Sequence, residues 1–137
     1  MKKAPEYNWS DAWLLLAVIY AGPEGATLER IIEVGNGIEH AIFNPDELES
    51  GLARLTTGGH VHDKAGVFYA TSPVMTAHQK TTSPQRSIEK ELSDIEKYLG
   101  AASSADPQPH SNNLRYPGFT KEAYTEAVNN YLARHRR

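Results

Sequence analysis

The sequence predicts a mainly α-helical protein that carries one small β-hairpin. Three observations predict this fold class. Apolar residues recur at helical spacing in several segments, residue types that favour helix caps precede those segments, and one stretch changes to a strand-turn-strand pattern. The chain has 137 residues, enough for one domain with additional segments. We therefore expect a helical domain with a hairpin, followed by further helices towards the C-terminus.

The first two expected helices lie before the middle of the chain. The first runs from the N-cap Ser10 to about Ala21, and its dense apolar residues indicate that it lies mostly in the core. The second begins near Thr27, another residue suited to an N-cap. The sequence VGNG at residues 34–37 is expected to break or bend this second helix.

The stretch FNPDELESGLARL, residues 43–55, carries the strongest helix signal. Asn44 is a favourable N-cap, Pro45 suits the first helical position, and Glu47 stands where a capping box requires it. Three apolar residues are spaced four and three apart and share one face of this helix: Leu48, Leu52 and Leu55. This face is predicted to pack on the core.

The next stretch, HVHDKAGVFYAT, has apolar residues on both sides of the turn-forming DKAG and predicts a β-hairpin. Over residues 10–72, the order helix, helix, capped helix and hairpin resembles the winged helix-turn-helix superfamily of bacterial regulators. The resemblance is carried by PDELESGLARLTTGGHV and the hairpin that follows it. In that superfamily the third helix enters the major groove of DNA and the hairpin, or wing, touches the backbone or the minor groove.

Composition divides the chain into four expected parts. A winged-helix-like domain covers residues 1–80, and an amphipathic helix covers residues 81–100. The small, polar and proline-containing residues 101–118 are typical of a linker. A last helix at residues 119–137, capped by Thr120, has a broad apolar face that is expected to dock on another surface.

The amphipathic helix is expected to begin at the cap Ser83 and to end at Gly100. Four of its apolar residues are spaced four, three and four apart, as in a short heptad seam. The seam consists of Ile88, Leu92, Ile95 and Leu99. Two interpretations stay open: two chains share this seam in a dimer, or it packs on the protein's own first helix.

The resemblance implies that Arg54, Thr56, Thr57 and Lys64 contact DNA, since arginine pairs with guanine and threonine contacts bases or phosphates. The charge argues against this role. Residues 24–57 carry seven carboxylates and two arginines, a net charge of −5, and the whole chain carries −3. Because affinity for DNA depends on neutralising phosphates, such an acidic region repels a duplex.

We therefore favour a non-enzymatic regulatory or interaction module that binds protein partners or its own copies. A DNA-binding transcriptional regulator is the alternative. No set of residues can be placed in catalytic roles, and no cofactor is expected. The chain has no cysteine, which fits a cytoplasmic location. Acidic and polar residues separate the N-terminal lysines from the apolar run, so no secretory signal is expected. The run is also too short for a membrane span.

A metal site in the hairpin is a minor alternative. His60 and His62 are two residues apart, and residues at that spacing on a strand point the same way. Zinc normally needs four ligands, and the sequence offers no third residue at a convincing spacing. We therefore predict no bound metal.

Overall fold

The computed structural model describes residues 9–22, 24–81, 83, 85, 87–103 and 120–135. The elements in chain order are α1 (Trp9–Ala21), α2 (Leu28–Glu39), α3 (Pro45–Thr57), β1 (Val61–Lys64), β2 (Val67–Ala70), α4 (Ser72–Thr81), α5 (Ile88–Ser103) and α6 (Lys121–His135). The two strands form an antiparallel hairpin. The expectation of a mainly helical protein with one small hairpin is thus confirmed.

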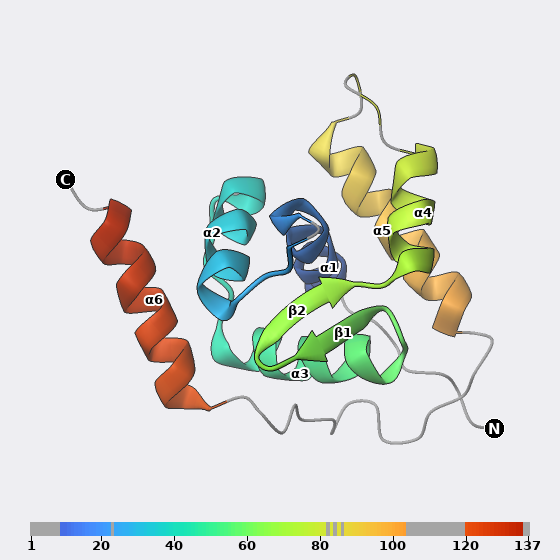
Figure 1. Ribbon diagram of the computed structural model, residues 1–137. Helices are drawn as coiled ribbons and strands as arrows, with labels where there is room; N and C mark the ends of the chain where they lie inside the picture. Colours follow the sequence, from blue (N-terminus) through green and yellow to red (C-terminus); the bar gives the residue numbers. More distant parts are fainter. Residues whose placement is uncertain are drawn as a thin grey trace.

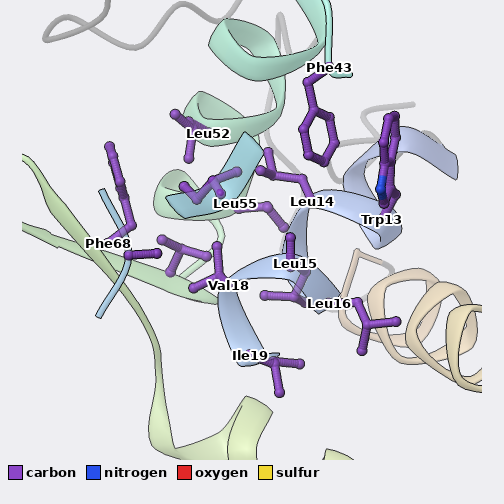
Figure 2. Close-up of a cluster of buried hydrophobic side chains, with 14 of the residues drawn as sticks. Trp13, Leu14, Leu15, Leu16, Val18, Ile19, Phe43, Leu52, Leu55 and Phe68 are labelled. Atoms are coloured by element: carbon purple, nitrogen blue, oxygen red, sulfur yellow. The ribbon is translucent and has the colours of Figure 1, made fainter. Parts of the chain in front are cut away.

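Helix α1 is the centre of the molecule. Its residues 11–19 are all buried, as expected of a helix that is apolar around most of its circumference. It packs against α2, α3, α5 and β2, which surround it (Figure 1). Figure 2 shows its leucines among side chains from α3 and the hairpin, such as Leu52 and Phe68. The prediction that this apolar segment is a core helix is confirmed.

Helix α2 is continuous through residues 34–37, so the expected break at its glycines is wrong. Gly35 is buried, and a Cβ atom there would lie 2.3 Å from Cε2 of Phe43. The ring of Phe43 stacks on Trp13 with 3.7 Å between the ring centroids. Nε1 of Trp13 donates a hydrogen bond of 2.9 Å to the Gly35 carbonyl oxygen. The glycine is needed for close packing, and the helix ends only at His40, whose φ is 58°.

Helix α3 begins as the sequence predicts. The Asn44 side chain accepts a hydrogen bond from the Glu47 backbone N–H at 2.8 Å, and the Glu47 carboxylate accepts one from the Asn44 N–H at 2.9 Å. Pro45 occupies the first turn. The three leucines of its apolar face are fully buried: Leu48, Leu52 and Leu55. The capping box and the buried face are both confirmed.

The hairpin closes through Ala65 and Gly66, whose φ values of 54° and 83° suit a tight two-residue turn. The Asp63 carboxylate accepts a hydrogen bond of 3.1 Å from the Gly66 N–H. On the other side of β2, Ala26 forms an isolated bridge to Phe68 through two hydrogen bonds of 2.8 Å each. The segment between α1 and α2 thus adds a third, one-residue strand to the hairpin.

Helices α4 and α5 lie on the same side of α1 (Figure 1). Helix α5 starts at Ile88, later than expected from a cap at Ser83, because the Ser87 hydroxyl caps it by accepting the Lys90 N–H at 3.2 Å. It also continues through Gly100, which was expected to end it. Residues 73–82 carry no clear helix or strand signal in the sequence, and most of them form α4.

Helix α6 begins after Thr120, whose hydroxyl accepts a hydrogen bond of 3.0 Å from the Ala123 N–H, as expected of an N-cap. The helix lies along α2, on the side of the molecule away from α4 and α5 (Figure 1). The expected docking of the last helix is therefore observed, and α2 is the surface that receives it. The linker expected at residues 101–118 lies largely outside the described residues.

Candidate functional site

The outer surface of α3, where the resemblance places DNA contacts, is acidic. Asp46 is exposed near the start of the helix, and Glu47 and Glu49 are half-buried beside it. Thr57 is exposed at the other end. Arg54 is the only basic residue in α3, and it is buried. The helix therefore offers carboxylates to the solvent and no cation.

Arg54 was expected on the outer face of α3, and that expectation is wrong. Its side chain is 4% exposed and forms an ion pair with Asp11 of α1, which is 0% exposed. Nε donates to Oδ2 of Asp11 at 2.7 Å and Nη2 donates to Oδ1 at 2.9 Å. This two-pronged pair satisfies both carboxylate oxygens and joins α1 to α3 inside the protein.

Gly51 makes this ion pair possible. A Cβ atom at Gly51 would lie 2.7 Å from Cδ2 of Leu14 and 2.9 Å from Oδ1 of Asp11. The missing side chain lets α1 approach α3 closely, one helical turn before Arg54. The guanidinium is thus directed into the gap between the helices, and in this arrangement it does not reach a base edge.

The other residues expected to contact DNA have different surroundings. Thr56 is half-buried, and its hydroxyl donates to backbone carbonyls of its own helix, the closer being that of Leu52 at 2.7 Å. Thr57 and Lys64 are exposed. Of the four residues, only these two present side chains to solvent, and only Lys64 brings a positive charge.

The heptad seam of α5 packs inside the protein, against α1. Three of its residues, Leu92, Ile95 and Leu99, are at most 4% exposed, and α5 packs on α1. Ile88 is 36% exposed at the start of the helix. Of the two interpretations left open, the structure shows packing on the protein's own first helix. Sharing the seam between two chains would require α5 to leave α1.

A polar cluster joins α1, α4 and α5, in which His78 and Glu91 are buried and Tyr20 is 40% exposed. The carboxylate of Glu91 accepts a hydrogen bond from the Tyr20 hydroxyl, and its Oε1 lies 2.9 Å from Nε2 of His78. The rings of Tyr20 and His78 meet edge to face at 5.5 Å. Sequence reasoning missed this cluster, although the position of Glu91 on the apolar side of α5 was a signal. The cluster ties the three helices together, and His78 also lines a pocket of about 360 Å³ between α4 and α5.

The two hairpin histidines lie in different surroundings. His60 is 5% exposed and meets the Tyr98 ring at 5.5 Å, whereas His62 is exposed and lies near Tyr69. Among the residues that the structure describes, no group of three or more histidines, aspartates and glutamates is arranged to hold a metal ion.

Burial lowers the pKa of His60 below its usual value of 6.5, because the protein interior disfavours the charged ring. The unfolded chain takes up this proton near pH 6.5 while the folded chain resists it. The stability due to neutral His60 is therefore complete above that pH and is lost as the pH falls. We expect the melting temperature to fall less between pH 7.5 and 5.5 in a His60→Gln variant than in the natural chain.

The matched control for this measurement is His62→Ala, which removes an exposed histidine from the same hairpin. Its melting temperature should follow the pH as steeply as that of the natural chain. An unchanged pH dependence in His60→Gln would contradict the expectation.

No protein-family model, curated protein or solved structure matches this chain. In the described part of the chain, no helix combines the length and the apolar character that crossing a membrane requires.

Proposed function

We propose that residues 9–70 form a winged-helix-like unit and that the protein is a non-enzymatic interaction module for protein partners. The order of three helices and a hairpin supports the winged-helix proposal. So does the bridge from Ala26 to Phe68, because it adds a short third strand between the first two helices and the wing.

The burial of one arginine is the main reason to favour a protein partner over DNA. The only basic side chain of α3, that of Arg54, is held inside the protein by Asp11. A helix that reads the major groove uses basic and amide side chains on its outer face. Helix α3 instead presents Asp46 and neighbouring carboxylates there.

The charges around α3 support the same choice. Within residues 24–57, the only lysine or arginine besides Arg54 is Arg30, whose guanidinium pairs with Glu33 at 3.0 Å. Glu29 and Glu33 also pair with Arg134 of α6, but the seven carboxylates of this segment still outnumber the three arginines that meet it. Because binding to DNA replaces counterions on phosphates with lysine and arginine, this surface repels a duplex.

We expect the full chain not to bind a labelled random duplex in fluorescence anisotropy, even at low salt. The acidic surface of α3 is the physical reason. The matched variant Asp46→Lys/Thr57→Lys changes two exposed residues at the two ends of α3, and it should gain weak, salt-sensitive binding.

Binding of the natural chain with an affinity that falls steeply as salt rises would overturn the proposal. It would favour the second candidate, a DNA-binding transcriptional regulator. The exposed position of Lys64 beside the hairpin turn supports that candidate. In that case, Lys64→Ala should weaken binding and reduce its dependence on salt.

A further inference from the structure

We propose that α6 is an internal ligand, and that the face of α2 beneath it binds an amphipathic helix of a protein partner that carries a positive residue near its C-terminus. The partner helix displaces α6 and takes its place. This inference rests on the proposed function, because it names the class of partner and the surface that receives it.

The contacts of α6 run antiparallel to α2. The Tyr124 hydroxyl donates to the Phe43 carbonyl oxygen at 2.6 Å, beyond the C-terminal end of α2. The Tyr131 hydroxyl donates to Oδ1 of Asn36 at 2.7 Å. Near the start of α2, Nε of Arg134 donates to Oε2 of Glu29 at 2.6 Å. The helix is thus positioned along the full length of α2.

The contacting residues of α6 form one stripe. Tyr124, Ala127, Tyr131 and Arg134 are spaced three, four and three apart, so they share one face of a helix. Ala127 and Tyr131 are 7% and 8% exposed in the contact with the body of the protein. Small and aromatic anchors at this spacing are the pattern of a helix bound in a groove.

The receiving surface is complementary in charge to such a helix. Glu29 and Glu33 of α2 both face Arg134, at 2.6 and 3.6 Å. Arg134 stands in the last turn of α6, where a positive charge also stabilises the helix end. A partner helix therefore needs a positive residue near its C-terminus and two aromatic residues on the preceding face.

The docking of α6 is shallow enough to be reversed. The Arg134 side chain is 49% exposed, and ion pairs at such exposure contribute little to stability. Leu132, on the same helix, is 39% exposed. Beside this stripe, Ala123 and Ala127 of α6 and Phe68 of the hairpin line a common pocket of about 540 Å³.

Helix α6 also depends on this contact for its own structure. It has 15 residues, and isolated helices of that length are marginally stable in water. Undocking therefore loses the contacts of this stripe together with part of the helical structure of α6. The covalent connection opposes undocking, because it holds α6 near α2 at an effective concentration on the order of 1 mM.

The test uses a fluorescent synthetic peptide of residues 119–137, titrated into full chains and followed by anisotropy. The natural chain should bind it weakly, because its own α6 occupies the site. The full chain Tyr131→Ala/Arg134→Glu, whose α6 loses two of its anchors on α2, should bind the natural peptide more tightly by about tenfold or more.

Two controls test whether the peptide binds at the face of α2 that α6 covers. A milder chain, Tyr131→Phe, removes the hydroxyl that donates to Asn36 but keeps the aromatic ring, and it should bind the peptide about two- to tenfold more tightly. Adding Glu29→Lys/Glu33→Lys to the chain Tyr131→Ala/Arg134→Glu should abolish tight binding of the natural peptide. An Arg134→Glu peptide should bind that charge-reversed chain better than the natural peptide does.

Equal affinity of all these chains for the peptide, or no binding by any of them, would overturn the inference. Light scattering that shows a natural-chain dimer, lost in Arg134→Glu, would also overturn it, because the occupant would then be α6 of a second copy. The DNA titration is independent of these results. A failed peptide titration would contradict the proposal that this surface binds a helix. Binding to duplex DNA would contradict the proposed function instead.

Discussion

We expect Arg54→Met to lower the free energy of unfolding by about 3–5 kcal/mol, because it leaves the carboxylate of Asp11 buried without its charged partner. Urea unfolding followed by tryptophan fluorescence measures the change, since Trp13 lies in the core. The substitution keeps most of the side-chain volume. The loss therefore comes from the uncompensated charge rather than from a cavity.

Two further variants identify the cause of this loss. The double variant Asp11→Ala/Arg54→Met removes both charges and should be more stable than Arg54→Met alone. Arg30→Met breaks an ion pair on the surface, where the arginine side chain is 48% exposed, and should change stability by less than about 1 kcal/mol. A similar loss in Arg30→Met and Arg54→Met would show that burial of the pair is not the cause.

We expect Gly35→Ala to destabilise the protein by about 1–3 kcal/mol, because the added methyl group overlaps the Phe43 ring. Displacing that ring also disturbs its stacking on Trp13. Thermal unfolding and urea unfolding both measure the effect. The near-ultraviolet circular dichroism of the stacked rings should change in the same variant.

Gly37→Ala is the matched control in the same helix. Gly37 is exposed, and a Cβ atom there would meet nothing within 4 Å. Alanine should therefore stabilise α2 by about 0.5–1 kcal/mol, because it favours helix more than glycine does. Effects of the same sign in Gly35→Ala and Gly37→Ala would contradict the role assigned to Gly35.

Local signals in the sequence predicted the elements that depend on neighbouring residues. The capping box of α3 involves only Asn44 and Glu47, three positions apart, and the hairpin turn involves adjacent residues. The glycines of α2 were misinterpreted because the reason for Gly35 lies in the ring of Phe43, outside the helix. Helix propensity depends on the residue type alone, so it could not predict this contact with a residue outside the helix.

The candidate site was harder to predict, because its chemistry depends on distant pairs. Arg54 and Asp11 are 43 positions apart, and nothing in either local sequence indicates that they meet. An arginine on a helix with a leucine face was expected to point outwards. The acidic character of residues 24–57, by contrast, could be predicted from the sequence, because counting charges needs no knowledge of contacts.

The burial of α1 on all sides has a consequence for how the chain folds during its synthesis on the ribosome. At 5–20 residues per second, on the order of ten seconds pass between synthesis of α1 and synthesis of α5. During that time the apolar side chains of α1 that α5 will cover lack their final partner. A nascent chain that ends before α5 should therefore be a preferred substrate for ribosome-associated chaperones.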